Sequence, residues 1–216
     1  MKIGVLGTGM VGVAIATKLA ELGHELTMGA RQAGNEKAVA WASEAGENAG
    51  EGSFADACLD AELVFNCTAG MFSLEALRAA GADNLSGKVL VDVANPLDFS
   101  QGMPPTLSAC NTDSLGEQVQ REFPDARVVK ALNTVNASVM TDPGSVPGDH
   151  VVFVCGDDDL AKQRVIGLLG EIGWPADRVV DLGDISAARG TEMYMPLWLR
   201  MMSSLGTPQF NIALAR

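Results

Sequence analysis

Short apolar runs alternate with longer stretches in which apolar residues recur at a helical spacing. The apolar runs predict strands at residues 2–7, 25–30, 61–68, 88–95, 127–134, 150–156 and 178–182, with a weaker strand at 47–53. The longer stretches predict helices at residues 13–22, 41–45, 73–80, 114–123, 159–172 and 187–204, before an extended tail at 208–214. Strands that alternate with helices in this way indicate a parallel sheet covered on both faces.

Glycines occupy the turn after the first predicted strand. Gly7-Thr-Gly-Met-Val-Gly12 lies directly between that strand and the first helix. Gly7 allows the tight turn, Gly9 lets the backbone approach a pyrophosphate, and Gly12 lets the helix pack close to the sheet. The phosphates would meet the unpaired N–H groups of the helix N-terminus, where the helix dipole favours negative charge. The pattern is the fingerprint of dinucleotide binding.

The chain shows no internal repeat, low-complexity segment or linker that would separate two domains. We therefore expect one NAD(P)-binding Rossmann domain over residues 1–216, whose C-terminal helix and tail begin at about residue 185. Its fold class is α/β: a three-layer, Rossmann-like doubly wound, mainly parallel sheet with a C-terminal helical extension.

The end of the second strand predicts which dinucleotide binds. NAD sites usually place Asp or Glu there for the ribose 2′-hydroxyl. This chain instead has Gly29, Ala30 and Arg31, and its next carboxylate is Glu36. Small residues leave space for a 2′-phosphate, and Arg31 can meet that phosphate with paired hydrogen bonds, with Lys37 as a second cation. The alternative is a solvated surface arginine, but the position favours NADP.

Composition excludes several kinds of partner. The 216 residues carry a net charge of −12, and their 15 basic residues form no cluster, which argues against a nucleic-acid partner. Four separated cysteines and two histidines show no metal-binding or disulfide pattern. The apolar N-terminal run is interrupted by glycines, unlike a signal peptide, and no stretch is long enough to span a membrane. These features predict a cytoplasmic protein without metal.

Ligands of doubly wound sheets bind outside the carboxyl ends of the strands. Thr68, Ala69 and Gly70 follow one strand there and could lie beneath a nicotinamide ribose. Asn95 and Asn133 end two further strands, and their amides suit a carboxamide or the polar edge of an acceptor. Equally, both residues could simply terminate strands. The long connections at residues 96–113 and 135–149 lie on the same side and are placed as a substrate lid would be.

Further motifs give the chain a resemblance to a known family. They are Gly29 to Arg31, Asp92-Val-Ala-Asn-Pro96, Lys130-Ala-Leu-Asn-Thr134, Cys155-Gly-Asp-Asp158, and Asp181 to Arg189 with Glu192. Together with the glycine turn, they resemble the NADP oxidoreductase, coenzyme F420-dependent family over nearly the whole chain. The resemblance implies hydride transfer between NADP(H) and a flavin-like acceptor, such as coenzyme F420. It also implies that Thr8 to Val11, Ala30 and Arg31 hold the NADP phosphates. The family often has serine where this chain has Ala30, which removes one hydroxyl donor.

These considerations define two sets of candidate residues. The cofactor set is Gly7, Thr8, Gly9, Met10, Val11, Gly12, Ala30, Arg31, Thr68, Ala69, Gly70, Ala94 and Asn95. The acceptor set is Pro96, Asn133, Thr134 and Trp198. No side chain is expected to act as a catalytic acid, base or nucleophile, because hydride transfer relies on the cofactors and needs the protein mainly for orientation and a dry site.

The C-terminal helix is apolar on nearly every face between Met193 and Met202, and such a helix must be covered almost all round. We therefore predict a homodimer that uses this helix and the tail, with Trp198 near the acceptor. Pro196 predicts either a kink or a new helical start.

Two other function classes stay open. One is a non-catalytic NADP(H) sensor. The other is a reductase of a small imine or carbonyl compound. Such reductases carry a sizeable helical domain after the sheet, whereas only residues 183–216 follow the last predicted strand here.

Overall fold

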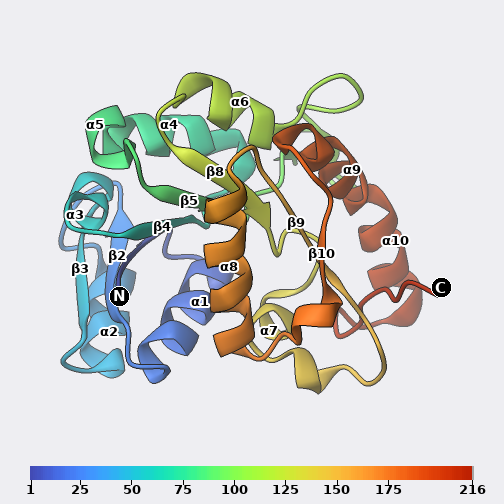
Figure 1. The fold of residues 1–216 in the computed structure, drawn as a ribbon, viewed down its shortest axis with the longest axis horizontal. Coiled ribbons are helices and arrows are strands. Elements are labelled where there is room, and N and C mark those ends of the chain that lie inside the picture. The colour runs from blue at the N-terminus through green and yellow to red at the C-terminus, as the bar shows by residue number, and fades with distance from the viewer. Residues whose placement is uncertain (216) are drawn as a thin grey trace.

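An eight-stranded sheet runs through the molecule, with helices on both sides of it (Figure 1). The computed structural model describes residues 1–215. Its strands are β1 (Lys2–Leu6), β2 (Glu25–Ala30), β3 (Ala49–Ser53), β4 (Leu63–Asn66), β5 (Val89–Asp92), β8 (Arg127–Ala131), β9 (Val152–Cys155) and β10 (Val179–Asp181). They are ordered β10-β9-β8-β5-β4-β1-β2-β3, and every neighbouring pair is parallel except β8 and β9. The predicted fold class is confirmed.

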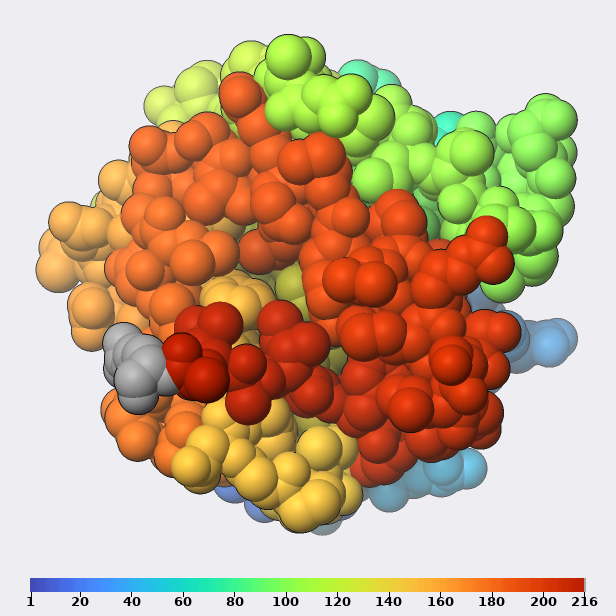
Figure 2. Space-filling model, turned by 90° about the vertical axis from the view of Figure 1, so that its right-hand side faces the viewer, coloured from blue at the N-terminus to red at the C-terminus, as the bar shows by residue number. Residues whose placement is uncertain are grey.

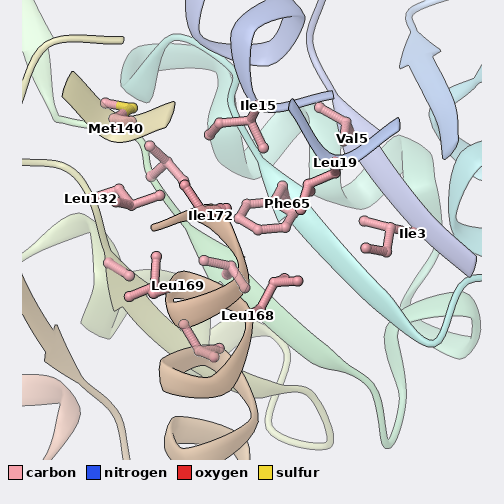
Figure 3. Close-up of a cluster of buried hydrophobic side chains, with 14 of the residues drawn as sticks. Ile3, Val5, Ile15, Leu19, Phe65, Leu132, Met140, Leu168, Leu169 and Ile172 are labelled. Carbon is pink, nitrogen blue, oxygen red and sulfur yellow. The ribbon is translucent and has the colours of Figure 1, made fainter. Parts of the chain in front are cut away.

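Two apolar layers join the helices to the sheet. One face is covered by α1 (Met10–Glu21), α2 (Glu36–Ala45), α7 (Ala137–Thr141) and α8 (Asp159–Ile172). The other face is covered by α3 (Phe54–Leu59), α4 (Gly70–Ala80), α5 (Ala82–Leu85), α6 (Leu115–Glu122) and the start of α9 (Ala188–Met193). Figure 3 shows part of the first layer, where Phe65 of β4 lies among side chains from α1 and α8. Burial on both faces explains why central strands such as β4 and β5 are mainly apolar runs.

The strand order reverses between β1 and β4, the neighbours at the centre of the sheet. From β1 the chain proceeds outward through β2 to β3, then returns and proceeds the other way from β4 to β5 and β8. The loops after β1 and β4 therefore lead away from each other and leave a crevice at the carboxyl ends of these strands. In doubly wound sheets this crevice is the usual ligand site.

Side-chain caps set helix boundaries that the apolar pattern did not predict. Helix α2 begins at Glu36 rather than at residue 41, because Asn35 accepts hydrogen bonds from the N–H groups of Lys37 and Ala38. Helix α3 was missed, although Ser53 and Asp56 form a capping box at its start. The short α5 was missed as well. Helices α1 and α4, which no side chain caps, begin at Met10 and Gly70 rather than at residues 13 and 73.

The two long connections contain short elements of their own. The first forms the antiparallel pair β6 (Leu97–Asp98) and β7 (Thr106–Leu107), and the loop between them projects at the upper right of Figure 1. The second contains α7 and the 3-10 turn η1 (Pro143–Ser145). Further 3-10 turns, η2 (Ala176–Arg178) and η3 (Ile185–Ala187), flank β10. Short elements fix the course of both connections without adding to the main sheet.

The C-terminal segment consists of two helices rather than the single one predicted. Helix α9 ends before Tyr194, and α10 (Met195–Leu205) begins there with Pro196 in its first turn. Pro196 thus marks a new helical start, one of its two predicted roles. The tail continues to a β-bridge between His150 and Ala213. Figure 2 shows this segment spread across one face of the molecule, beside residues 140–150. No helix within residues 1–215 has the length and apolar character needed to cross a membrane.

Candidate functional site

The glycine turn has the geometry that its sequence predicts. Gly7 adopts a φ of +114°, and a Cβ there would lie 2.8 Å from the carbonyl oxygen of Cys67. A Cβ on Gly12 would lie 2.1 Å from the carbonyl oxygen of Gly7, so α1 packs too closely for a side chain. By contrast, a Cβ on Gly9 would meet nothing within 4 Å. Gly9 is thus the one glycine of the three whose surroundings are open.

The N-terminus of α1 opens toward this space. Gly9 is the N-cap residue, no side chain caps the helix, and its first turn contains no acidic residue. The first N–H groups of a helix lack partners within it and carry the positive end of the dipole. This helix end therefore suits an anionic group.

A cavity of about 490 Å³ lies in front of the glycine turn. Its lining includes Gly7, Thr8, Gly9, Ala30 and Arg31 from the ends of β1 and β2, and Phe72 from α4. Arg31 is exposed, its guanidinium carbon lies 5.7 Å from the centroid of the Phe72 ring, and it forms no ion pair with residues 1–215. An unneutralised arginine and an open helix N-terminus thus border one cavity.

A second cavity of about 740 Å³ lies on the other side of the β4–α4 turn. Its wall includes four methionines and three aromatic residues, and Asp98 is the single charged residue among the described residues that line it. Its lining comprises Met10, Val11, Cys67, Thr68, Ala69, Gly70, Met71, Phe72, Val93, Ala94, Asn95, Leu97, Asp98, Phe99, Ser100, Asn133, Val135, Asn136, Ala137, Met140, Met195 and Trp198. Cys67, Thr68, Ala69 and Phe72 line both cavities, which therefore adjoin each other.

Most predicted residues border one of the two cavities. The smaller cavity takes Gly7, Thr8, Gly9, Ala30 and Arg31, and the larger takes Met10, Val11, Gly70, Ala94, Asn95, Asn133 and Trp198. Gly12, Pro96 and Thr134 line neither cavity. Pro96 and Thr134 are both buried, and Thr134 is 2% exposed, so their assignment to the acceptor pocket stays a prediction. Both residues adjoin asparagines that do line the larger cavity.

Gly70 is small for a packing reason that the sequence did not reveal. A Cβ there would lie 1.9 Å from the carbonyl oxygen of Asn95, so the start of α4 packs directly on the end of β5. The aromatic and methionine walls of the larger cavity were also missed, notably Phe72, Phe99, Met140 and Met195. They come from α4, the loop after β6, α7 and α10, and no local pattern relates them.

Asn95 and Asn133 hold each other across the ends of β5 and β8. Asn95 Nδ2 donates to the carbonyl oxygen of Asn133 at 2.8 Å, and Asn133 Nδ2 donates to Asn95 Oδ1 at 3.0 Å. Leu132 precedes this pair with a φ of +63°, a conformation that non-glycine residues rarely adopt. The amides thus stabilise the strand ends and also border the larger cavity, so the two interpretations of the sequence are compatible.

A buried ionic cluster lies behind the carboxyl ends of β5 and β8. Lys130 Nζ lies 2.8 Å from Asp92 Oδ2 and 2.7 Å from Glu192 Oε1, and it also donates to the carbonyl oxygen of Ala94. Burial opposes the charge of Lys130, but the two carboxylates outweigh it and hold the Lys130 pKa above its ordinary value. Burial raises the pKa of Glu192, against the effect of Lys130. An ammonium has three donors, and all three are used here.

Glu192 also ties α9 to α6. Its carboxylate accepts hydrogen bonds from the N–H groups of Leu115 and Gly116, at 2.8 and 3.0 Å. These are the first N–H groups of α6, where a negative charge is stabilised. The ionic cluster thus fixes the C-terminal helices, including the wall formed by Met195 and Trp198, to the central strands.

Trp198 lies between the larger cavity and the tail. It is 8% exposed, and its ring stacks on Phe210 with centroids 5.4 Å apart and an interplanar angle of 24°. Trp198 Nε1 has no hydrogen-bond partner among residues 1–215. The chain's own tail therefore supplies part of the cover that α10 requires, while one buried donor at the cavity wall stays unused.

Other candidate chemical groups have structural roles. His150 Nε2 lies 3.0 Å from the carbonyl oxygen of Pro143, away from both cavities. Asp158 caps α8 by accepting from the N–H group of Ala161. Cys67 borders both cavities, but burial raises the pKa of its thiol, which opposes formation of the nucleophilic thiolate.

Known proteins resemble this chain in sequence and in fold. The model of the family described as NADP oxidoreductase coenzyme F420-dependent matches residues 2–96. The F420-dependent NADP reductase of Methanocaldococcus jannaschii is 30% identical over 208 residues, covering 91% of this chain and 90% of the relative. A crystal structure of a candidate F420-dependent NADP reductase from Arthrobacter sp. FB24 has 54% identity and a TM-score of 0.94, with both chains fully covered.

A more distant structure shares the fold alone. The reductive aminase from Aspergillus terreus in complex with NADPH and ethyl levulinate is 21% identical, with a TM-score of 0.67. The alignment covers 95% of this chain but 62% of the aminase. Over a third of that protein thus has no counterpart in this chain.

Proposed function

This chain belongs to the NADP oxidoreductase, coenzyme F420-dependent family, and from that premise we propose that it transfers hydride between NADP(H) and a flavin-like acceptor. Coenzyme F420 is the first acceptor to consider, because the relatives are named for it. The family makes the protein an NADP-dependent oxidoreductase. The acceptor and the residues that hold each ligand are our proposal.

The smaller cavity would hold the adenosine and phosphate half of NADP(H). The open N-terminus of α1 at Gly9 suits the pyrophosphate, and Arg31, which has no acidic partner within residues 1–215, suits the 2′-phosphate. No hydroxyl assists Arg31 at the preceding position, because that residue is Ala30. These features fit the cofactor by charge and by access.

The larger cavity would hold the nicotinamide ring and the acceptor ring together. Its volume of about 740 Å³ lies within the range typical of small-molecule sites, and its walls are mainly apolar. Met140, Met195 and Trp198 offer flat or adaptable surfaces to a planar ring. When bound, NADPH supplies the hydride. The side chains orient the two rings and exclude water, so no acid, base or metal from the protein is required.

The observation that carries this proposal is that the two cavities adjoin at Thr68, Ala69 and Phe72. One cavity is built for an anionic group and the other for apolar rings. A dinucleotide is a molecule with both characters, and it would cross the carboxyl ends of β1 and β4 at the point where the strand order reverses.

Reduction of a small imine or carbonyl compound is a weaker alternative. The aminase shares the fold at 21% identity, whereas the F420-dependent NADP reductase of Methanocaldococcus jannaschii is 30% identical to this chain. A non-catalytic NADP(H) sensor would use the first cavity without the second, which leaves the apolar walls unexplained.

Oxidation of NADPH by a panel of acceptors tests the proposal. The panel contains coenzyme F420, its deazaflavin headgroup without the tail, riboflavin, a quinone and a cyclic imine. We expect rapid oxidation with the deazaflavins or with riboflavin, and none with the imine. Trp198→Ala should slow the reaction, whereas Trp174→Phe, a buried control outside both cavities, should not. Oxidation by the imine alone would favour the reductase, and NADPH binding without any turnover would favour the sensor.

We also propose a homodimer that uses the outer faces of α9, α10 and the tail. Leu197 and Leu205 of α10 are 57% and 59% exposed, and Met193 at the end of α9 is 38% exposed. Phe210 covers Trp198 but not these side chains, so apolar surface remains on this face. Light scattering should give twice the mass of the chain. Leu197→Glu should convert the dimer to a folded monomer, and a monomeric wild-type protein would refute this proposal.

A further inference from the structure

A chain of buried hydrogen bonds connects Lys130 to Thr68, and we infer that it fixes the direction of the hydrogen bond that Thr68 offers to the cofactor. Lys130, Asp92 and Asn66 act in this inference as positioning residues, because none of them lines either cavity. The inference rests on the proposed function, since it requires bound NADP(H) at the junction of the two cavities. It assigns one half of the cofactor to Thr68.

The hydrogen-bond partners of Asp92 determine its charge state. Its Oδ2 accepts from Lys130 Nζ at 2.8 Å, and its Oδ1 accepts from Asn66 Nδ2 at 2.8 Å and from the N–H group of Ala94 at 3.3 Å. All three neighbours are hydrogen-bond donors. A protonated carboxyl group would need an acceptor for its own proton, and these contacts offer none. Asp92 is therefore a carboxylate, held beside the ammonium of Lys130.

The carboxylate fixes the orientation of the Asn66 amide. A carboxylate only accepts hydrogen bonds, so Asn66 must turn its NH₂ group toward Asp92 and its carbonyl oxygen away from it. This NH₂ group donates its second proton to Ser73, whose Oγ lies 3.1 Å from Asn66 Nδ2. Asn66 is fully buried, so water does not compete for these bonds. The amide oxygen, Asn66 Oδ1, therefore faces Thr68.

The orientation of Asn66 in turn fixes the proton of Thr68. Thr68 Oγ1 lies 2.6 Å from Asn66 Oδ1, and since that oxygen can only accept, the Thr68 hydroxyl donates to it. Ser73 Oγ lies 2.9 Å from Thr68 Oγ1. Because the single proton of Thr68 is already used, Ser73 donates to Thr68. Thr68 Oγ1 then has no proton left to offer and retains one acceptor position.

This polarity selects which part of the cofactor Thr68 can contact. Thr68 is half-buried and lines both cavities, so it borders the middle of the proposed dinucleotide site. Phosphate oxygens are acceptors, so they cannot form a hydrogen bond with Thr68 Oγ1. The ribose hydroxyls and the carboxamide N–H groups of the nicotinamide half are donors, so they can form one. The chain from Lys130 thus excludes the phosphates from Thr68. Because Thr68 also lines the larger cavity proposed for the nicotinamide ring, we assign it to the nicotinamide-ribose half of NADP(H).

Two ligands separate this assignment from a general effect on binding. NADPH contains the nicotinamide half, whereas adenosine 2′,5′-bisphosphate lacks it. Thr68→Val keeps the shape of the side chain and removes its oxygen. We expect this variant to bind NADPH about 3- to 10-fold more weakly, the range for one neutral hydrogen bond, and to bind the bisphosphate as the wild type does. Thr68→Ser keeps the hydroxyl and should restore NADPH binding.

The role of the positioning residues is tested through Asn66. Asn66→Ala releases the Thr68 hydroxyl from its fixed direction, so NADPH affinity should fall as in Thr68→Val, again without loss for the bisphosphate. The double variant should bind NADPH no more weakly than Thr68→Val alone, because both changes remove the same hydrogen bond. Additive losses, or equal losses for both ligands, would overturn the inference. A purely structural role would weaken both ligands together.

Arg31→Ala distinguishes failure of this inference from failure of the proposed function. That variant should weaken both ligands, because both carry the 2′-phosphate. If Arg31→Ala weakens both and Thr68→Val weakens neither, the polarity argument is wrong and the proposed function stands. If the wild-type protein binds neither ligand, the proposed function itself fails. The half-buried Thr68 variants decide the assignment even where Asn66→Ala does not fold.

Discussion

Replacing Arg31 by alanine should weaken binding of NADPH much more than binding of NADH. Arg31 directly follows β2, lines the smaller cavity and forms no ion pair with any of residues 1–215, so its charge is available to a 2′-phosphate. A hydrogen bond to a charged group contributes roughly 1.5–3 kcal/mol, which corresponds to about 10- to 100-fold in affinity. Because Arg31 is exposed, water and salt screen the interaction, and we expect the lower part of this range.

Calorimetric titration of NADPH and NADH into both proteins measures this difference. Arg200→Ala is a matched control, since Arg200 is also exposed but lines neither cavity. It should leave both affinities unchanged. The NADPH deficit of Arg31→Ala should also shrink at high salt, because the interaction is electrostatic. An equal loss for NADPH and NADH would refute the assignment of Arg31 to the 2′-phosphate. A loss of NADPH affinity in Arg200→Ala as large as that in Arg31→Ala would refute it too.

Three further predictions test the surrounding structure. Gly9→Val should abolish NADPH binding in calorimetry while the melting temperature is kept, whereas Gly12→Val should lower the melting temperature, because its Cβ would lie 2.1 Å from a carbonyl oxygen. Normal NADPH binding by Gly9→Val would count against the pyrophosphate site. Lys130→Met leaves two buried carboxylates without their cation and should cost about 3–5 kcal/mol in chemical denaturation; an unchanged midpoint would contradict this. Truncation after Ile185 should give aggregation or loss of acceptor reduction, and a soluble, fully active product would disprove it.

Much of the fold could be predicted from local patterns in the chain. The buried strands of the sheet are short apolar runs, and helix α8 was predicted with the boundaries it has in the structure. Two helix starts were missed because a polar cap, rather than apolar spacing, begins the helix, as Asn35 does for α2 and Ser53 for α3. These caps depend on a few neighbouring residues, so closer attention to capping patterns could have found them.

The cofactor side of the site was more predictable than the acceptor side. The glycine turn and Arg31 lie at strand ends, and the strand order of a doubly wound sheet brings such ends together. Pro96 and Thr134 line neither cavity, because position next to a strand end does not determine where a side chain points, and their assignment to the acceptor stays a prediction. Phe72, Phe99 and Met195 lie in separate segments of the chain, and only tertiary packing brings them to one cavity.

The sequence by itself determined the elements, the glycine turn and the cation at the end of β2, because these depend on residues that are close neighbours in the chain. Only the tertiary structure decided how distant residues combine. Asp92 and Lys130 are 38 positions apart, and Glu192 meets the start of α6 from 77 positions away. Parallel register places β5 beside β8, and the burial of these charges then requires partners that the strands themselves lack. Charged residues in apolar strands signal that requirement, but packing alone determines which groups satisfy it.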